Sequence, residues 1–155
     1  MNKKFYQNGL NFTCMECGEC CRLPEGRVDI IPDEVSAISV YLGIKEEEFL
    51  KQYCAIAEEK VELRENAQKE CIFLEDNRCI IYPVRPLQCR TFPFWPENLK
   101  FHFRWSQLKQ FCRGIDQGKH HSIEKIEEKR IKQKRYDKKL KYSWLEKIEK
   151  PYIQS

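Results

Sequence analysis

The sequence lacks long apolar runs, and this absence excludes two classes of protein. No run of hydrophobic residues approaches the roughly 18 that a membrane-spanning helix requires. The opening residues, MNKKFYQNGLNF, also contain no apolar segment of the kind found in a secretory signal. We therefore expect a cytoplasmic protein with no membrane partner.

The motifs of several common enzyme classes are absent as well. The sequence has no nucleotide-binding glycine loop, no serine nucleophile elbow and no HExxH string. Catalysis would therefore depend on a bound metal, and whether the protein is an enzyme stays open. What the chain does contain is typical of a folded domain, because 41% of its 155 residues are hydrophobic and it has three Trp and nine Phe. This length favours a single core.

Charge divides the chain at Gly118. Residues 1–118 contain 16 Lys and Arg against 18 Asp and Glu, a net charge of −2, whereas residues 119–155 contain 12 against 6, a net charge of +6. We predict a cysteine-bearing metal-binding domain over residues 1–118 and a charged C-terminal helix over residues 119–155 that packs on it.

The C-terminal helix is predicted from Ile123 onward, with Pro151 limiting its end. Apolar side chains recur there at helical spacing, which indicates one face packed on the body. They are Ile123, Ile126, Tyr136, Leu140, Trp144 and Ile148. Residues 124–141 also contain 13 charged side chains, nine of them basic. We interpret these as a solvated face rather than as a surface for nucleic acid.

Five shorter elements are predicted in the body. Alternation around residues 28–30 indicates a strand, and a helix is expected from Pro32 to Gly43. A second helix opens with three glutamates and carries an apolar face over residues 46–57. The segments CIFL and CIIY at 71–82 flank a turn and predict a hairpin. Strict alternation in LKFHFRW, at 99–105, predicts a half-buried strand.

Cysteine is the most unusual component, with nine residues in the chain. Because stable disulfides are not expected in the cytoplasm, metal or redox chemistry is considered first. Cys54 lies on the apolar face of the second predicted helix, and we interpret it as core packing. The candidate metal ligands are the other eight: Cys14, Cys17, Cys20, Cys21, Cys71, Cys79, Cys89 and Cys112.

The first four candidates form the string CMECGECC. Two residues between cysteines let a tight turn direct both sulfurs at one metal, and Gly18 allows the backbone to reverse. Cys20 and Cys21 are neighbours, so in extended backbone they point to opposite faces and do not easily share one tetrahedral centre. We hypothesise that this pair links two nearby centres. Zinc and iron–sulfur clusters both usually take four thiolates, so eight cysteines suit two sites, or one site with reserve thiols.

Four of the ten arginines are sequence neighbours of candidate cysteines. A guanidinium group can offset the negative charge of a four-thiolate site, so we predict that these arginines support the bound cofactor. They are Arg22, Arg78, Arg90 and Arg113.

In its cysteine motifs the chain resembles the YkgJ-type cysteine-cluster family, named for a zinc- or iron-chelating CxxCxxCC domain. The resemblance covers FTCMECGECCR at 12–22, CIFLEDNRCIIYPVRPLQCRTFPF at 71–94 and CRGIDQG at 112–118. It implies metal chelation by the eight candidate cysteines, and Arg113 stands where the family often has proline. Members are often described by similarity as iron–sulfur oxidoreductases, and the domain occurs in flagellin lysine N-methylases. The resemblance therefore implies a redox or methyl-transfer role without fixing the reaction.

We predict a small irregular α+β domain in which short strands and turns present the cysteines, packed by two central helices and a long C-terminal helix. The leading functional prediction is binding of iron–sulfur clusters or zinc through the CxxCxxCC motif and the distal cysteines. The alternative is a non-enzymatic structural zinc module whose basic helix contacts a protein or nucleic-acid partner. In either case folding should depend on the metal.

Overall fold

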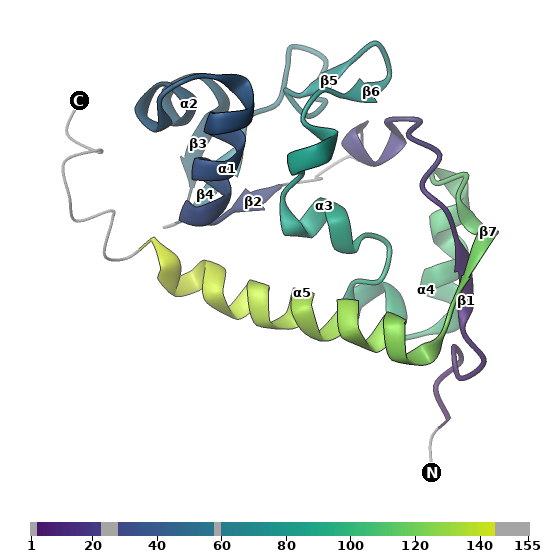
Figure 1. Ribbon diagram of the computed structural model, residues 1–155. Coiled ribbons are helices and arrows are strands. Elements are labelled where there is room, and N and C mark those ends of the chain that lie inside the picture. Colours follow the sequence, from purple (N-terminus) through teal and green to yellow (C-terminus); the bar gives the residue numbers. More distant parts are fainter. Residues whose placement is uncertain (1–2, 23–27, 58–59, 145–155) are drawn as a thin grey trace.

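The computed structural model describes residues 3–22, 28–57 and 60–144, and it shows a mixed α+β protein (Figure 1). The helices are α1 (Pro32–Leu42), α2 (Glu46–Tyr53), α3 (Leu87–Thr91), α4 (His102–Gln107) and α5 (Ile123–Ser143). The 3-10 helices are η1 (Glu19–Arg22), η2 (Tyr82–Val84), η3 (Pro96–Leu99) and η4 (Leu108–Gln110). The strands are β1 (Leu10–Phe12), β2 (Asp29–Ile30), β3 (Cys54–Ala57), β4 (Lys60–Leu63), β5 (Leu74–Glu75), β6 (Arg78–Cys79) and β7 (Ile115–His121). The predicted fold class is confirmed.

The strands form three small antiparallel sheets. Strand β1 pairs with β7, β4 lies between β2 and β3, and β5 pairs with β6. In Figure 1 the β2–β4–β3 sheet lies with α1 and α2 at one end of the molecule, and the β1–β7 pair lies with α4 at the other. Helix α5 extends along the molecule from one end to the other, and α3 lies between the two ends. One core cluster includes Phe49 and Phe73, and a second includes Phe94 and Trp105.

Helix α1 follows the sequence prediction closely. It begins at Pro32, and the Glu34 carboxylate accepts a hydrogen bond from the backbone N–H of Ile31 at 3.0 Å. Gly43 ends the helix with a φ of 70°, a left-handed conformation in which a residue with a Cβ is strained. The prediction of this helix is confirmed at both ends.

The second predicted helix is only partly correct. Helix α2 ends at Tyr53, and residues 54–57 instead form β3, which pairs with β4. The sequence pattern missed this change because the apolar side chains of 54–57 suit a buried strand as well as a helix face. Cys54 is 4% exposed and belongs to the same core cluster as Phe49, so its interpretation as core packing is confirmed.

The strand predicted over residues 99–105 is wrong. The segment contains the end of η3 and the start of α4. A helical turn brings Trp105 into the core, where its Nε1 donates to Asp116 Oδ1 at 2.9 Å and its ring stacks on Phe94. Phe101 and Phe103 are exposed and stack on each other, so the alternation marked no buried sheet face.

The hairpin predicted over residues 71–82 is confirmed, with shorter arms than the pattern indicated. Strands β5 and β6 contain two residues each, and Leu74 pairs with Cys79. Asp76 and Asn77 form the turn with φ values of 49° and 64°, the conformation required at both central positions of a two-residue hairpin loop.

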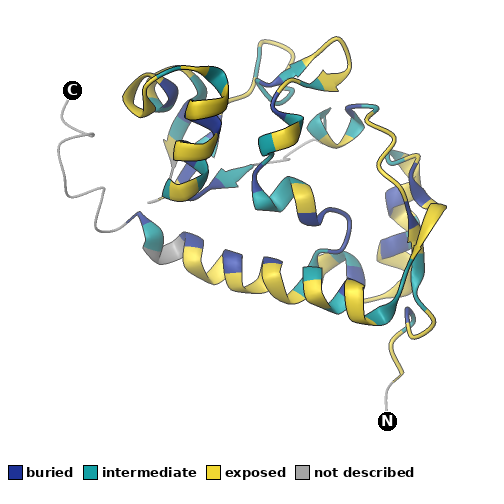
Figure 2. Cartoon of the chain, in the orientation of Figure 1, coloured by how far each residue is buried: buried dark blue, intermediate teal, exposed yellow. Residues whose placement is uncertain are grey.

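Helix α5 packs one face on the body, as predicted. Tyr136, Leu140 and Trp144 are buried, and Figure 2 shows the buried residues along the edge that faces the other elements. Trp144 Nε1 donates to the backbone carbonyl of Ile30 at 2.7 Å, which ties the end of the helix to β2. The predicted positions Ile148 and Pro151 lie outside the described residues. Within the described part of the chain, no helix is both long and apolar enough to cross a membrane.

Candidate metal centre

The CMECGECC segment lies against the β5–β6 hairpin. The backbone N–H of Cys71 donates to the carbonyl of Cys21 at 2.8 Å. Gly18 has a φ of 76°, and a Cβ at this position would lie 2.7 Å from the carbonyl oxygen of Asn77. Only glycine fits this close approach without strain. The local backbone therefore joins two cysteine-bearing segments that are distant in sequence.

The thiols of these two segments are in contact. The side chain of Cys21 forms hydrogen bonds with the side chains of Cys20 and Cys71. These bonds lower the pKa of Cys20 to about 7 and also lower the pKa of Cys71, while they raise the pKa of Cys21. A thiol that keeps its proton stabilises a neighbouring thiolate by donating to it, and loses acidity itself. Cys21 thus links the thiol of Cys20 on η1 to the thiol of Cys71 at the entry to the hairpin.

Cys79 and Cys89 approach this group from β6 and α3. Burial raises the pKa of the Cys79 thiol, and it raises the pKa of the Cys89 thiol further. The negative charges of Cys20 and Cys71 also raise the pKa of both thiols. The thiols of Cys79 and Cys89 are therefore within electrostatic reach of those two cysteines. Buried thiols that face other thiols are costly to ionise without a cation, so their environment favours metal coordination.

Cys112 lies beside the first half of the motif. Burial raises the pKa of its thiol, and the charges of Cys17 and Cys20 raise it further. The backbone holds the segment of Cys112 against the segment that precedes Cys14. The N–H of Thr13 donates to the carbonyl of Gly114, and a Cβ on Gly114 would lie 2.1 Å from the carbonyl oxygen of Thr13. The pairing of β1 with β7 continues this contact.

The remaining two cysteines are placed differently. The thiol of Cys14 hydrogen-bonds with the hydroxyl of Tyr82, whose pKa is raised chiefly by burial and also by this bond. Cys54 lies in the core, where burial raises its pKa to about 12 and the neighbouring charge is that of Arg64 rather than of another thiol. Hydrogen bonds or charges thus link seven of the eight candidate ligands to another cysteine, and Cys14 is linked to Tyr82.

The donor set fits a soft metal, because thiolates bind zinc and iron–sulfur clusters. Within the described residues, no set of three or more Cys, His, Asp or Glu side chains is already arranged to hold a metal ion. The fit therefore rests on the chemistry of the eight thiols and on the contacts among Cys20, Cys21 and Cys71.

The four arginines predicted beside the cysteines are placed unequally. Arg22 is partly buried and forms ion pairs with Glu70 and Glu19 at 2.5 and 3.3 Å. The other three, Arg78, Arg90 and Arg113, are exposed. Their role at a cofactor stays a prediction.

Arg85 is the residue that sequence reasoning missed. Its guanidinium carbon lies 3.6 Å from the centroid of the Tyr82 ring, and its positive charge lowers the pKa values of Cys20, Cys79 and Cys89. The missed signal was the RPLQC string, in which this arginine stands four residues before Cys89 rather than beside it. Arg85 and Pro86 have extended backbone with ψ values of 143° and 153°, so helical spacing to Cys89 does not account for this placement.

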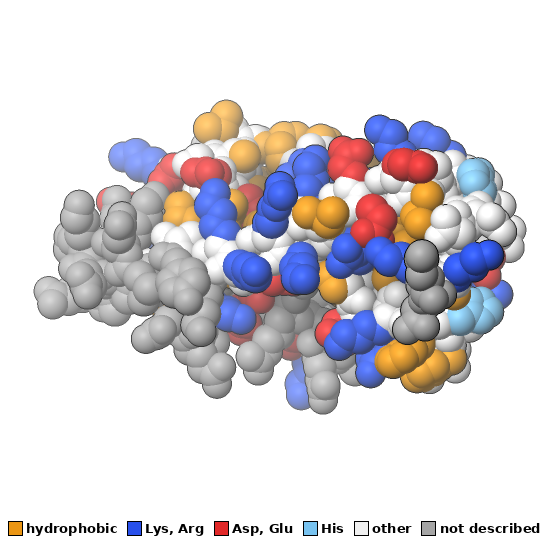
Figure 3. Space-filling model, turned by 90° about the horizontal axis from the view of Figure 1, so that it is seen from below, with side chains coloured by type: hydrophobic (Ala, Val, Ile, Leu, Met, Phe, Trp, Pro, Cys, Tyr) orange, Lys and Arg blue, Asp and Glu red, His pale blue; other side chains and the backbone are white. Residues whose placement is uncertain are grey.

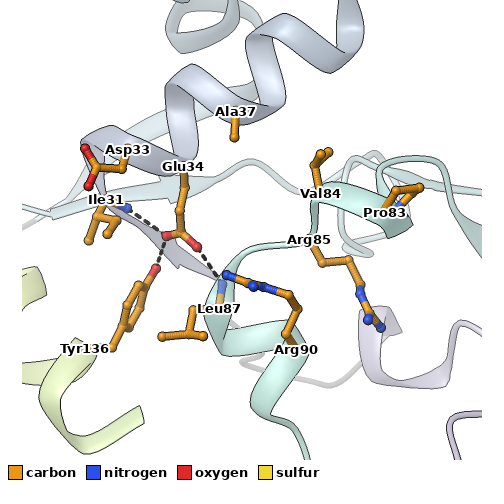
Figure 4. A pocket seen from close by; sticks show the side chains of 10 residues that line it. All are labelled: Ile31, Asp33, Glu34, Ala37, Pro83, Val84, Arg85, Leu87, Arg90 and Tyr136. Carbon is orange, nitrogen blue, oxygen red and sulfur yellow. Dashed lines mark hydrogen bonds between the residues drawn. The ribbon is translucent and has the colours of Figure 1, made fainter. Parts of the chain in front are cut away.

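A cleft of about 390 Å³ has Arg85 in its lining (Figure 4). It lies between α1, α3 and α5, and Glu34 and Tyr136 form part of its lining. The carboxylate of Glu34 accepts hydrogen bonds from the backbone N–H of Leu87 and from the Tyr136 hydroxyl. This acidic group is therefore committed to holding three elements together.

Comparisons with known proteins agree with this picture. A family model described as "Putative zinc- or iron-chelating domain", CxxCxxCC, matches residues 13–113. An uncharacterized protein of Methanocaldococcus jannaschii, MJ0661, is 35% identical over 124 residues, which cover 74% of this chain and 65% of that protein. A second one from the same organism, MJ0939, is 28% identical over 121 residues, covering 72% of this chain and 39% of that protein. The chain thus spans less than two thirds of either relative, and no solved structure matches it.

The family match includes all eight candidate ligands and supports metal binding in general. It also confirms the resemblance drawn from the sequence. The chain belongs to the CxxCxxCC family of zinc- or iron-chelating domains.

Proposed function

We propose that the eight cysteines outside the core hold one or two metal centres, either iron–sulfur clusters or zinc ions. The observation that carries this proposal is the contact of the Cys21 thiol with the thiols of Cys20 and Cys71. Thiols of separate segments gather in this way at metal sites, and the reducing cytoplasm, where we expect the protein, keeps them from forming stable disulfides.

The arrangement suits two neighbouring centres. The charge of Cys71 acts on Cys79 and Cys89, whereas the charge of Cys17 acts on Cys112. The charge of Cys20 acts on thiols in both groups. The pair Cys20 and Cys21 would then link the two centres, as the sequence hypothesis holds.

An iron–sulfur cluster supplies one-electron redox chemistry when bound, and a zinc ion supplies a structural link or a Lewis acid. The chain contributes thiolates on rigid backbone and neighbouring positive charge. Cys14 and Cys20 are exposed residues, so this side of the centre is open to solvent and to a substrate. This exposure supports the redox or methyl-transfer role that we include in the proposal.

Metal analysis of anaerobically purified protein tests the proposal. An iron–sulfur protein is brown, absorbs visible light and contains stoichiometric iron and sulfide, whereas a zinc protein is colourless and contains stoichiometric zinc. Protein that contains neither metal, and takes up neither on reconstitution, would refute the proposal.

A matched pair of cysteine variants locates the site. We expect Cys17→Ser to lower the metal content and the melting temperature together, because metal binding contributes to folding. Cys54→Ala also removes one thiol, but this thiol lies in the core, so metal content should stay unchanged. Equal metal loss in the two variants would contradict the assignment of ligands.

A second candidate function rests on α5. Figure 3 shows Lys and Arg side chains spread over the underside of the molecule. The exposed basic residues in the second half of this helix are Lys132, Lys134, Arg135, Lys138 and Lys139. A structural zinc module would use this face to contact an acidic protein or nucleic acid. Affinity for a nucleic acid should then fall steeply between low and physiological salt, and binding that ignores salt would exclude contact with phosphates.

A further inference from the structure

Arg85 is a cation beside the thiols that lacks a compensating acid. Its Nε atom is buried and has no hydrogen-bond partner. Within the described part of the chain, no carboxylate forms an ion pair with Arg85. Arg85 is partly buried, and a buried N–H without a hydrogen-bond partner costs free energy.

The backbone holds Arg85 at this place. It follows η2, and its N–H donates to the carbonyl of Tyr82 at 3.4 Å. The next residue, Pro86, is buried and accepts a hydrogen bond from the N–H of Cys89 at 2.9 Å. The Tyr82 hydroxyl also forms a hydrogen bond with Cys14, so the ring under the guanidinium group is itself in contact with the cysteine motif.

The side chain of Arg85 lines the cleft and extends from there toward η1, the segment that carries Cys20 and Cys21. Figure 4 shows it directed to the segment that carries η1, whereas the side chain of Arg90 turns the other way. Two acids line the cleft: Glu34 already accepts hydrogen bonds from Leu87 and Tyr136, and Asp33 forms an ion pair with Lys139 at 3.9 Å. The guanidinium lies over the Tyr82 ring, and the negative charges that act near it are those of the thiols and of Glu16.

The other cations of this region are less suited to balance the thiols. Arg22 is paired with Glu70 and Glu19. Lys129 packs over the ring of Phe94 at 5.3 Å, and burial lowers its pKa. Arg85 is thus the cation that combines a charge directed at the thiols with a fixed position.

A divalent ion held by four thiolates keeps a net negative charge, and this charge is the partner that Arg85 lacks. We infer that Arg85 is a positioning residue that balances the charge of the thiolate centre and so strengthens metal binding without ligating the metal. This inference rests on the proposed function. Partners outside the ligand shell typically change metal affinity by about 10- to 100-fold.

The test measures Zn²⁺ affinity by competition with a chromophoric chelator, and the thiolate absorption of the Co²⁺-loaded protein. Arg85→Met removes the charge and keeps an unbranched side chain, whereas Arg85→Lys keeps the charge and loses the planar group. Arg104→Met is the matched control, because Arg104 is an exposed arginine on α4 whose ion pair with Glu97 is 3.9 Å long. If Arg85→Met does not fold, Arg85→Gln takes its place.

We expect Arg85→Met to weaken Zn²⁺ binding by about 10- to 100-fold. Arg85→Lys should recover most of this affinity, Arg104→Met should match the wild type, and the Co²⁺ spectrum should show the same thiolate ligands in every variant. The inference is overturned if Arg85→Met binds Zn²⁺ like the wild type, or if the Lys and Met variants lose affinity equally with a changed Co²⁺ spectrum, which indicates a packing role. Failure of the wild type to bind metal would instead refute the proposed function, and the inference with it.

Discussion

Replacing Gly18 by alanine should disrupt the contact between the cysteine motif and the hairpin. The φ of Gly18 is 76°, and the new Cβ would lie 2.7 Å both from the Asn77 carbonyl oxygen and from Leu74 Cδ1. The left-handed backbone alone costs a residue with a Cβ about 1–2 kcal/mol. Overpacking against a neighbouring backbone typically adds about 1–3 kcal/mol. The total is a large part of the stability of a small domain.

Gly43→Ala provides a matched control. Gly43 has a φ of 70°, and beyond its own chain neighbours no atom lies within 4 Å of the position that the alanine Cβ would take. This variant therefore carries only the backbone cost of about 1–2 kcal/mol. The difference between the two alanine variants isolates the packing of the motif on the hairpin.

Urea unfolding at saturating Zn²⁺ measures the stability of both variants, and chelator competition measures their Zn²⁺ affinity. We expect Gly18→Ala to be less stable than Gly43→Ala by about 1–3 kcal/mol. Only Gly18→Ala should lose Zn²⁺ affinity, because a displaced η1 separates its thiols from Cys71 and Cys79. Equal stability and equal affinity in the two variants would refute the reasoning.

Three further predictions concern a hydrogen bond of α5, an ion pair of α5 and the removal of the metal. Tyr136→Phe removes the hydroxyl whose single proton is within hydrogen-bond reach of the Asp29 carbonyl at 2.9 Å and of the Glu34 carboxylate. We expect a loss of about 1–3 kcal/mol in urea unfolding, and an unchanged midpoint would contradict this. Hydrogen bonding with Arg130 lowers the pKa of Glu127 from its usual 4.5 to about 2. Glu127 therefore stabilises the fold above its usual pKa and loses this effect as the pH falls toward 2, so wild type and Glu127→Gln should differ in melting temperature at pH 7 and converge near pH 2. A difference in melting temperature that stays the same from pH 7 to pH 2 would exclude the Glu127–Arg130 ion pair as its cause. Removing the metal with a strong chelator should lower the melting temperature and the cooperativity of unfolding, and an unaltered calorimetric transition would show that folding is independent of metal.

The sequence predicted those elements whose signals are local. Pro32, the acidic first turn and Gly43 mark both ends of α1, and apolar spacing marks the buried face of α5. These signals depend on backbone preferences that neighbouring elements do not change. The division of the chain at residue 118 stays a prediction, and β7 crosses that position.

The errors come from tertiary contacts. The alternation of residues 99–105 predicted a strand, but the segment is helical because the hydrogen bond from Trp105 to Asp116 and its stacking on Phe94 favour a helical turn. Arg85 was missed for a similar reason. The sequence prediction considered only arginines directly adjacent to a cysteine. The position of Arg85 depends instead on η2, the Tyr82 ring and the direction of α3.

X-ray absorption spectroscopy of the purified protein at the zinc and iron edges tests the central claim most directly. We expect a first shell of sulfur at about 2.3 Å, which is the distance of thiolate ligands from zinc. The shell should persist in Cys54→Ala and lose sulfur in Cys21→Ser. A first shell of nitrogen and oxygen, or a protein without either metal, would contradict the claim that the cysteines of CMECGECC and the later segments share a metal centre.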